Sequence, residues 1–488
     1  MRVVFATSEV SPIAKTGGLG DVCGSLPKAL TALGHDVTVF TPFYRQAAEW
    51  FQQNDVRPEQ IGAPVRIDWG NWSAEATFFR TTLPSSDIPL ILVANDFFFD
   101  RDDIYAGIVG SVDDFLQRYV FFCRALIKAC ELLDIAPDIL HAHDWHTALL
   151  PVYLHSGLRG SEQFRSTRSV YTIHNLNYQG AAPPAAFALT GLHARYWASD
   201  ALEHFGTLNP MKGGIIFADQ ITTVSPTYAE EIQTSAHGSG LDGVLRSVAY
   251  KFQGILNGID AEEWDPANDP NLEANFEPDK LQGKTISKRM LIKEAGLKSK
   301  PRTPLLAVVS RLVDQKGFQL LIPILGKLLR AGSQALVLGS GDMRYEEAFT
   351  RIGTEYSDAC RVWIGFDNAL AHRIYAGADL LLMPSVYEPC GLNQMYALRY
   401  GTLPVVRLTG GLADTVIPFD GTNRQEADGF GFHNMSADEL YLATWVGMLT
   451  NKDARTWNAL QSNAMAQDFS WSRSAQEYDA VYRRAAGA

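Results

Sequence analysis

Runs of apolar, mostly aliphatic residues alternate along the chain with longer segments of helical character. Each run is bounded by Gly, Pro, Asn, Asp or Ser, which is typical of parallel strands buried on both faces. Helices are expected between the runs, for example over 114–134 and 318–330. The alternation predicts an α/β protein with doubly wound parallel sheets. The predicted strands are 3–6, 37–40, 90–94, 139–142, 170–173, 221–224, 305–309, 335–338, 362–364, 380–383 and 403–406.

This strand–helix pattern occurs twice, which predicts two Rossmann-like domains over 1–249 and 250–467. The length of 488 residues agrees with two domains, because single cores rarely grow that large. The hinge is expected within 254–260 and the following segment 264–278, and the last segment, 468–488, contains an amphipathic helix over 474–488. Ligands of such folds bind where strands end, so residues that directly follow strands are the candidates for chemistry.

Composition and charge narrow the possible functions. With 46% hydrophobic and 20% charged residues the chain is an ordinary globular protein, and the net charge of −12 argues against a nucleic acid or an anionic membrane as partner. Five cysteines without a CxxC pair argue against disulfides and structural zinc, and Cys390 is expected to be a buried, inert thiol. The start, MRVVFAT, is typical of a first strand, and no apolar run has the length of a bilayer span. A cytoplasmic location is expected.

The first candidate site is the glycine-rich loop KTGGLGD at residues 15–21, between the opening strand and a helix expected to reach about Leu33. Gly17 and Gly18 can adopt positive φ and bring bare backbone against a ligand. The helix N-terminus offers N–H groups at the same place, and Lys15 adds a full charge. These features favour diphosphate binding, although the spacing is neither that of a P-loop nor that of a dinucleotide fingerprint. A glycine-rich turn with a solvated lysine fits the same residues.

A second group of candidates follows strands of the second domain. Arg311 and Lys316 leave one strand end, where two cations can neutralise a diphosphate. Gly341, in GSGD after the next strand, offers a further backbone nest. Glu388, in YEPCGL ahead of a helix over 393–399, can accept bonds from sugar hydroxyls while nearby amides hold phosphate. Charges that only cap strands and helices remain the alternative for these residues.

Histidines follow two strands of the first domain, in HAHDWHT and in IHN. A metal site is one interpretation, but His141 and His143 share a strand face that His146 does not, and no HExxH spacing accompanies them. Recognition of hydroxyl groups by imidazole and carboxylate, with Trp145 as a stacking face, suits a carbohydrate better. We therefore expect His174 and this cluster to bind sugar rather than metal.

Taken in order, the motifs resemble those of bacterial glycogen synthases and plant starch synthases, from residue 1 to beyond residue 415. The opening and EPCGL motifs are highly specific. The resemblance implies the GT-B fold, in which two Rossmann-like domains face a cleft and the last helix crosses back to the first domain. The motifs are ATSEVSPIAKTGGLGDV, HAHDWHTALLP, TIHNLNYQG, ILNGID, SRLVDQKG, GSGD, EPCGLNQMYALRYGTLPVVR and TGGLADTV.

The resemblance also implies an activity: retaining transfer of glucose from ADP-glucose to the non-reducing end of an α-1,4-glucan, without a metal or other cofactor. It implies that Lys15 meets the sugar-diphosphate end of the donor and that Arg311 and Lys316 hold the diphosphate. Glu388 would bind glucose hydroxyls, and His174 would stand against the transferred glucose. Preference for ADP over UDP rests on the resemblance alone.

Further residues are implied to bind substrate. Asp144, Trp145 and His146 would face the acceptor glucan. Asn393 stands where many relatives carry Thr or Ser, and Phe366 where adenine often meets Tyr, so donor affinity is expected to shift at these two positions. The full substrate-binding set is Gly17, Gly18, Asp21, Asp144, Trp145, His146, Asn257, Gly341, Phe366, Cys390, Gly391, Leu392 and Asn393.

Two other functions compete with a synthase. A phosphorylase of similar architecture would need a pyridoxal phosphate lysine, and the sequence shows no such motif. A non-catalytic glucan-binding protein would not need a diphosphate clamp, yet Lys15, Arg311, Lys316 and Glu388 are all present. The synthase is therefore the favoured prediction.

Overall fold

The computed structural model describes residues 1–105, 114–298 and 302–487, which form two compact units. Unit 1 comprises Met1–Gly258 with Trp471–Ala488, and unit 2 comprises Ile259–Ser470. The boundary predicted at 249/250 was therefore placed too early. Strand β11 (Phe252–Gly254) pairs in parallel with β10 (Gln220–Thr223), so the chain completes the first sheet before it leaves unit 1.

A nine-stranded sheet forms the centre of unit 1, in the order β11-β10-β7-β6-β1-β2-β5-β4-β3. Its strands pair in parallel except at β3 and β4, which form an antiparallel hairpin at one edge. The sequence prediction missed this hairpin because its half-exposed strands lack the continuous apolar runs of the central ones. The other strands of the sheet are β1 (Arg2–Ala6), β2 (Asp36–Pro42), β3 (Glu59–Trp69), β4 (Trp72–Thr82), β5 (Pro89–Ala94), β6 (Ile139–His143) and β7 (Arg168–Ile173).

Helices of unit 1 connect these strands and cover the sheet. They are α1 (Gly18–Ala32), α2 (Arg45–Gln53), α3 (Asp96–Phe99), α4 (Asp114–Leu132), α5 (Asp144–Thr147), α6 (Leu149–Ser156), α7 (Pro210–Phe217), α8 (Pro226–Glu231), α9 (Asp242–Ser247) and α18 (Trp471–Ala486). A two-stranded ribbon, β8 (Glu203–His204) and β9 (Thr207–Leu208), lies outside the main sheet.

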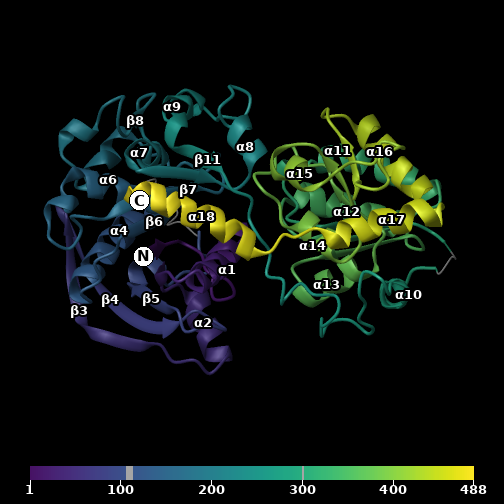
Figure 1. The fold of residues 1–488 in the computed structure, drawn as a ribbon, viewed down its shortest axis with the longest axis horizontal. Helices are drawn as coiled ribbons and strands as arrows, with labels where there is room; N and C mark the ends of the chain where they lie inside the picture. The colour runs from purple at the N-terminus through teal and green to yellow at the C-terminus, as the bar shows by residue number, and fades with distance from the viewer. Residues whose placement is uncertain (106–113, 299–301, 488) are drawn as a thin grey trace. The chain divides into compact units, whose positions relative to one another are not determined.

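The C-terminal helix α18 packs on unit 1, against α1 and β7, as Figure 1 shows in yellow. Ser474 Oγ donates to the carbonyl of Leu256 at 2.6 Å, and Tyr482 Oη lies 2.8 Å from His141 Nδ1 on the central strand β6. The final helix thus belongs to the first unit, as the resemblance implied, although it begins at Trp471 rather than at 468 or 474.

Unit 2 contains a six-stranded, fully parallel sheet in the order β14-β13-β12-β15-β16-β17. Every apolar run predicted as a strand in this half coincides with one of its strands. The strands of the sheet are β12 (Leu305–Val309), β13 (Gln334–Gly339), β14 (Cys360–Ile364), β15 (Leu380–Met383), β16 (Leu403–Arg407) and β17 (Phe430–Phe432), of which β17 was not predicted.

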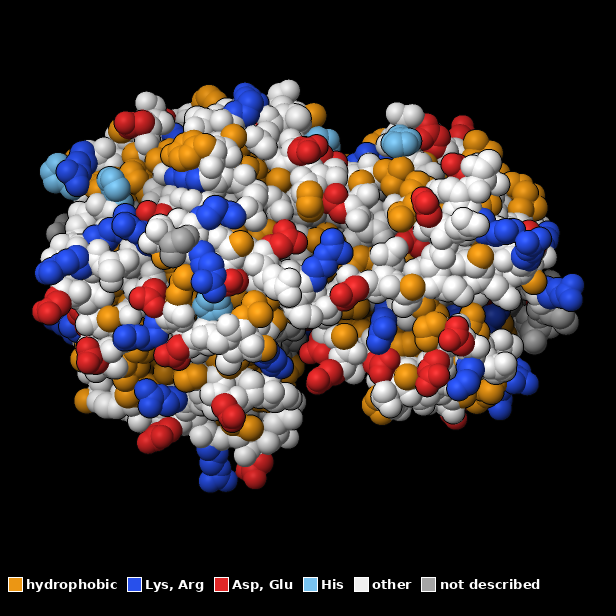
Figure 2. Space-filling view, viewed as in Figure 1, with side chains coloured by type: hydrophobic (Ala, Val, Ile, Leu, Met, Phe, Trp, Pro, Cys, Tyr) orange, Lys and Arg blue, Asp and Glu red, His pale blue; other side chains and the backbone are white. Residues whose placement is uncertain are grey.

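The helices of unit 2 are placed between and after these strands. They are α10 (Gln282–Glu294), α11 (Phe318–Arg330), α12 (Met343–Glu355), α13 (Asn368–Gly377), α14 (Asn393–Arg399), α15 (Gly410–Thr415), α16 (Ala437–Thr450) and α17 (Ala454–Ala466). None of the helices that the structure describes is long and apolar enough to cross a membrane. Figure 2 shows acidic and basic side chains interspersed over the visible face of each unit.

Candidate active site

The glycine-rich loop of unit 1 is organised by Glu9, a buried carboxylate just beyond β1. Its oxygens accept hydrogen bonds from the backbone N–H groups of Thr16 at 2.7 Å and Gly17 at 3.2 Å, and from the Thr16 hydroxyl at 3.0 Å. The Tyr105 hydroxyl also donates to Glu9, at 2.5 Å. Burial raises the pKa of Glu9, while these bonds act in the opposite direction. Glu9 was not among the residues predicted from the sequence. A carboxylate between a strand end and a glycine-rich loop is the signal that could have found it.

Geometry in this loop differs from the prediction in one respect. Gly17 has extended backbone (φ −165°) and caps α1, whose first residue is Gly18, so neither glycine uses positive φ. The glycine that must lack a side chain is Gly20, where an added Cβ would lie 2.5 Å from Lys15 Cβ. Lys15 Nζ is 2.6 Å from Asp21 Oδ1, and both side chains are partly exposed. The loop therefore presents an ion pair beside a helix N-terminus, while two of its amides are bound by Glu9.

Asp144 joins the ends of two strands. It follows β6 with left-handed backbone (φ 53°), and its Oδ1 accepts from the backbone N–H groups of His174 at 2.7 Å and Asn175 at 3.3 Å, just beyond β7. Burial raises the pKa of this carboxyl to about 7, although the two N–H donors lower it. The carboxylate that was expected to face an acceptor thus also fixes the backbone of His174.

The buried histidines form one neighbouring group. His143 Nδ1 lies 2.9 Å from His174 Nε2, and the ring of His146 stacks on Tyr105 at a centroid distance of 5.2 Å. Burial lowers the pKa of His146 and of His174 to about 3, so both imidazoles are neutral near pH 7. A neutral imidazole offers one donor and one acceptor, as recognition of hydroxyl groups requires. Within the described residues, no group of three or more His, Cys, Asp or Glu could hold a metal ion.

Tyr105 connects the two clusters of unit 1. Its hydroxyl binds Glu9 beneath the glycine-rich loop, and its ring stacks on His146 of the histidine cluster. Glu9 and Tyr105 therefore link the glycine-rich loop to the histidine cluster. The loop contains Lys15, Gly17, Gly18 and Asp21, and the cluster contains Asp144, Trp145, His146 and His174. Asn257, at the end of unit 1, is buried, and its Oδ1 has no hydrogen-bond partner among the described residues.

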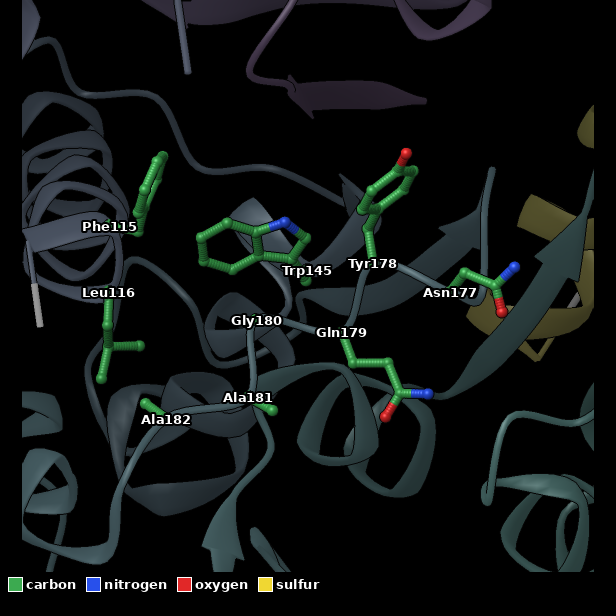
Figure 3. Close-up of a pocket in the computed structure, with 9 residues that line it drawn as sticks. All are labelled: Phe115, Leu116, Trp145, Asn177, Tyr178, Gln179, Gly180, Ala181 and Ala182. Carbon is green, nitrogen blue, oxygen red and sulfur yellow. The ribbon is translucent and has the colours of Figure 1, made fainter. Parts of the chain in front are cut away.

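A pocket of about 500 Å³ opens beside Trp145 in unit 1. Figure 3 shows the indole between Phe115 of α4 and Tyr178, with the segment from Asn177 to Ala182 passing along it. Three aromatic rings and two side-chain amides line the pocket, which is the chemistry that sugar rings and their hydroxyls require. The lining residues are Phe115, Leu116, Trp145, Asn177, Tyr178, Gln179, Gly180, Ala181 and Ala182.

In unit 2, Lys316 and Glu388 form a nearly buried ion pair. Lys316 Nζ lies 2.6 Å from Glu388 Oε2, and the Ser385 hydroxyl donates to the same oxygen at 2.9 Å. Lys316 follows β12, and Glu388 follows the adjacent strand β15, so the parallel sheet itself places both at one edge. Close backbone contact supports this arrangement: a Cβ on Gly317 (φ 73°) would lie 1.8 Å from the Pro384 carbonyl oxygen.

The loop after Glu388 turns its amides in one direction. Gln394 Nε2 donates to the carbonyls of Cys390 at 3.0 Å and Gly391 at 2.9 Å. Because C=O and N–H of a trans peptide point to opposite sides, the N–H groups of Gly391 and Leu392 point away from Gln394. Asn393 Nδ2 donates to the carbonyl of Val309 at 2.6 Å, which ties the start of α14 to the end of β12. Cys390 is buried, and burial is the state expected of an inert thiol.

The remaining candidates of unit 2 differ in their availability. Arg311 is exposed, and its guanidinium has no partner among the described residues, while Phe366 is 81% exposed. Gly341 does not form an open nest, because its N–H donates to Glu346 Oε1 at 2.7 Å and the next N–H donates to the Leu312 carbonyl at 2.7 Å. That Lys15 and Arg311 act on one diphosphate remains a prediction, since the two residues belong to different units.

Comparison with known proteins identifies the family. The model of the starch synthase catalytic domain matches residues 2–247, and that of glycosyl transferases group 1 matches residues 292–441. A glycogen synthase of Thermotoga maritima is 43% identical over 486 residues, with 99% of both chains covered. The chain belongs to the glycogen and starch synthase family. The resemblance deduced from the motifs is thereby confirmed.

Other members of this family agree over the whole chain. A glycogen synthase of an Anaeromyxobacter species is 44% identical over 485 residues, again with 99% of both chains covered. The solved catalytic domain of starch synthase IV from Arabidopsis thaliana, bound to ADP and acarbose, is 35% identical and superposes with a TM-score of 0.91, covering 100% of this chain and 99% of that one. The chain is a glycosyltransferase of glycogen and starch synthesis with the GT-B fold of its family.

Proposed function

We propose that the chain transfers glucose from ADP-glucose to the 4-hydroxyl at the non-reducing end of an α-1,4-glucan, with retention at the anomeric carbon. The buried Lys316–Glu388 pair carries this proposal, because it places a cation for phosphate and a carboxylate for sugar hydroxyls 2.6 Å apart at the edge of a parallel sheet. The starch synthase IV structure, which holds ADP and acarbose, supports a nucleotide donor and a glucan-like acceptor.

Unit 2 would bind the donor. Arg311 and Lys316 neutralise the diphosphate, and the outward N–H groups of Gly391 and Leu392 bind a phosphate or glucose oxygen. Glu388 accepts hydrogen bonds from glucose hydroxyls once the sugar competes with Lys316 for its carboxylate. Phe366 is exposed as a face for adenine, a role that rests on the family resemblance.

Unit 1 would supply the acceptor site and complete the donor site. The pocket beside Trp145 offers aromatic faces for glucose rings, and the neutral His146 and His174 offer hydroxyl partners. Lys15, paired with Asp21 at the start of α1, is an exchangeable cation for the sugar-diphosphate end. Transfer then requires both units to close on one substrate pair and exclude water, which would otherwise hydrolyse the donor.

In this mechanism charge develops on the departing phosphate oxygen as the acceptor hydroxyl attacks from the side that ADP leaves. Lys316 and Arg311 stabilise this charge, which is the task a divalent cation performs in other enzymes. We therefore propose that the reaction needs no metal. Full activity after dialysis against EDTA is the expected result, and activity that returns only with added Mg²⁺ or Mn²⁺ would contradict it.

The deciding assay measures ADP release from ADP-glucose with and without glycogen, and compares UDP-glucose as donor. We expect nucleotide release that depends on glycogen and is faster with ADP-glucose. Equal or faster release from UDP-glucose would overturn the donor assignment. Release of glucose 1-phosphate from glycogen and phosphate, without synthesis, would identify a phosphorylase instead.

A further inference from the structure

Gly180 lies directly against the indole of Trp145 in the pocket of unit 1. It has left-handed backbone (φ +67°), and a Cβ added to it would lie 2.2 Å from Trp145 Cε3 and 2.7 Å from Cδ2. Real carbon contacts are never this short, so a side chain at this position must displace either the segment or the ring. Figure 3 shows the backbone at Gly180 passing close to the indole, and the Cβ distances mean that only glycine allows this approach.

The segment that contains Gly180 is held by hydrogen bonds to other parts of unit 1. Gln179 Nε2 donates to the Ser239 carbonyl at 3.0 Å, and Gln179 Oε1 accepts from Asn209 Nδ2 at 2.7 Å. Ala182 exchanges two backbone hydrogen bonds with Leu208, each 2.9 Å long. Moving the segment away from Trp145 would break several of these bonds, whereas moving the ring breaks none of them.

Trp145 is held less firmly than the segment. Its ring meets Tyr119 edge-on at a centroid distance of 5.1 Å and His146 at 4.3 Å, and the remaining surface is partly exposed toward the pocket. An added methyl at Gly180 would therefore displace the indole, and both residues line the pocket. The ring would no longer present its face where a glucose unit can stack.

We propose that Gly180 is a positioning residue. Because it has no side chain, it fixes the position of the Trp145 indole in the pocket and thereby the affinity for the acceptor glucan. This inference rests on the proposed function, since it assumes that the pocket binds the acceptor. Gly180 itself need not touch the sugar. A displaced indole is expected to weaken acceptor binding about tenfold, the size of one lost aromatic contact, and to leave the donor site unchanged.

The test compares Gly180→Ala with Gly206→Ala in the full chain. Gly206 lies in the same unit and also has left-handed backbone (φ +78°), but nothing lies within 4 Å of an added Cβ, so it reproduces the backbone strain without the collision. Binding of maltohexaose is measured by calorimetry, and KM is measured for both substrates by ADP release. Gly180→Ala should raise Kd and KM for maltohexaose about tenfold with KM for ADP-glucose and kcat within about twofold, while Gly206→Ala stays within about twofold of the parent throughout.

Unchanged maltohexaose binding by Gly180→Ala, or an equal loss in Gly206→Ala, overturns the inference. Trp145→Ala separates this failure from failure of the proposed function: if Trp145→Ala also binds like the parent, the pocket is not the acceptor site. Trp145→Phe removes Cε3 and Cζ3, two of the three ring atoms nearest an added Cβ, and keeps Cδ2, so Gly180→Ala should cost less in that background than in the parent. The comparison in the Trp145→Phe background also decides the matter if Gly180→Ala alone does not fold, and an undiminished loss there counts against the inference.

Discussion

Replacing Lys316 with Ala tests the electrostatic core of the donor site most directly. Lys316 and Glu388 have only 16% and 6% of their side chains exposed, so their ion pair is screened little by solvent. Once Lys316 is removed, the Ser385 hydroxyl at 2.9 Å is the remaining partner of the Glu388 carboxylate among the described residues. The substitution therefore removes the cation proposed to stabilise the departing phosphate and leaves a buried charge nearly unpaired.

Two separate losses follow from this geometry. Breaking a buried pair typically costs about 3–5 kcal/mol of stability, and the lower end, about 3 kcal/mol, is expected here because Ser385 still donates to Glu388. Losing one preorganised contact to developing charge costs about 3–4 kcal/mol in the transition state, or a factor of about 10²–10³ in turnover. The first loss follows from the unpaired carboxylate and the second from the missing cation.

The double variant Lys316→Ala/Glu388→Gln distinguishes them. Its uncharged amide no longer needs a cation, so the free energy of unfolding should return to within about 1 kcal/mol of the parent, whereas turnover should stay at least about 10²-fold low. Urea unfolding followed by circular dichroism measures the first quantity, and ADP release measures the second. Lys327→Ala, an exposed lysine on α11, is the matched control and should change neither.

Near-normal turnover of the folded Lys316→Ala protein would refute the proposed role of this lysine. If the double variant does not regain stability, the unpaired charge of Glu388 is not the cause of the stability lost in Lys316→Ala.

Three further predictions concern pH and close packing. Burial lowers the pKa of His174 from 6.5 to about 3, so the stability that its neutral form contributes is fully present above pH 6.5 and is lost as pH falls below that value. His174→Asn should therefore reduce the slope of unfolding free energy against pH by about 1.4 kcal/mol per pH unit between pH 6 and 4. Burial raises the pKa of Asp144 from 3.8 to about 7, so ionisation of this carboxyl reduces stability as pH rises through that range. Asparagine also tolerates φ 53°, so the free energy of unfolding of Asp144→Asn, measured in urea, should equal that of the parent at pH 4 and exceed it at pH 8 by at most about 4 kcal/mol. Gly317→Ala should lower the free energy of unfolding by about 2–4 kcal/mol and abolish most of the activity, because its Cβ would meet the Pro384 carbonyl. Gly332→Ala (φ +99°), where nothing lies within 4 Å of an added Cβ, should lower it by about 1–2 kcal/mol and retain activity. Equal losses of stability in the two melting curves would show that backbone strain alone is responsible.

Much of the fold could be predicted from the sequence because a strand buried on both faces consists of consecutive apolar residues. The apolar runs located the central strands of both sheets, and helices such as α11 and α14 were predicted with the bounds they have. Ligand-binding candidates were found by their place after strands, and the ordered motifs identified the family. These signals are local, or depend only on the order of local signals, so they need no knowledge of three-dimensional contacts.

Tertiary structure decided what depends on residues far apart in the chain. The backbone N–H groups expected at Gly17 and Gly341 are occupied by the side chains of Glu9 and Glu346, and Asp144 turns toward the backbone of His174. The boundary moved because β11 pairs with a strand about thirty residues earlier, and Gly180 matters because Trp145 lies beneath it. A carboxylate or a glycine has the same letter in every context, and only packing determines which donor it satisfies or which ring it allows to approach.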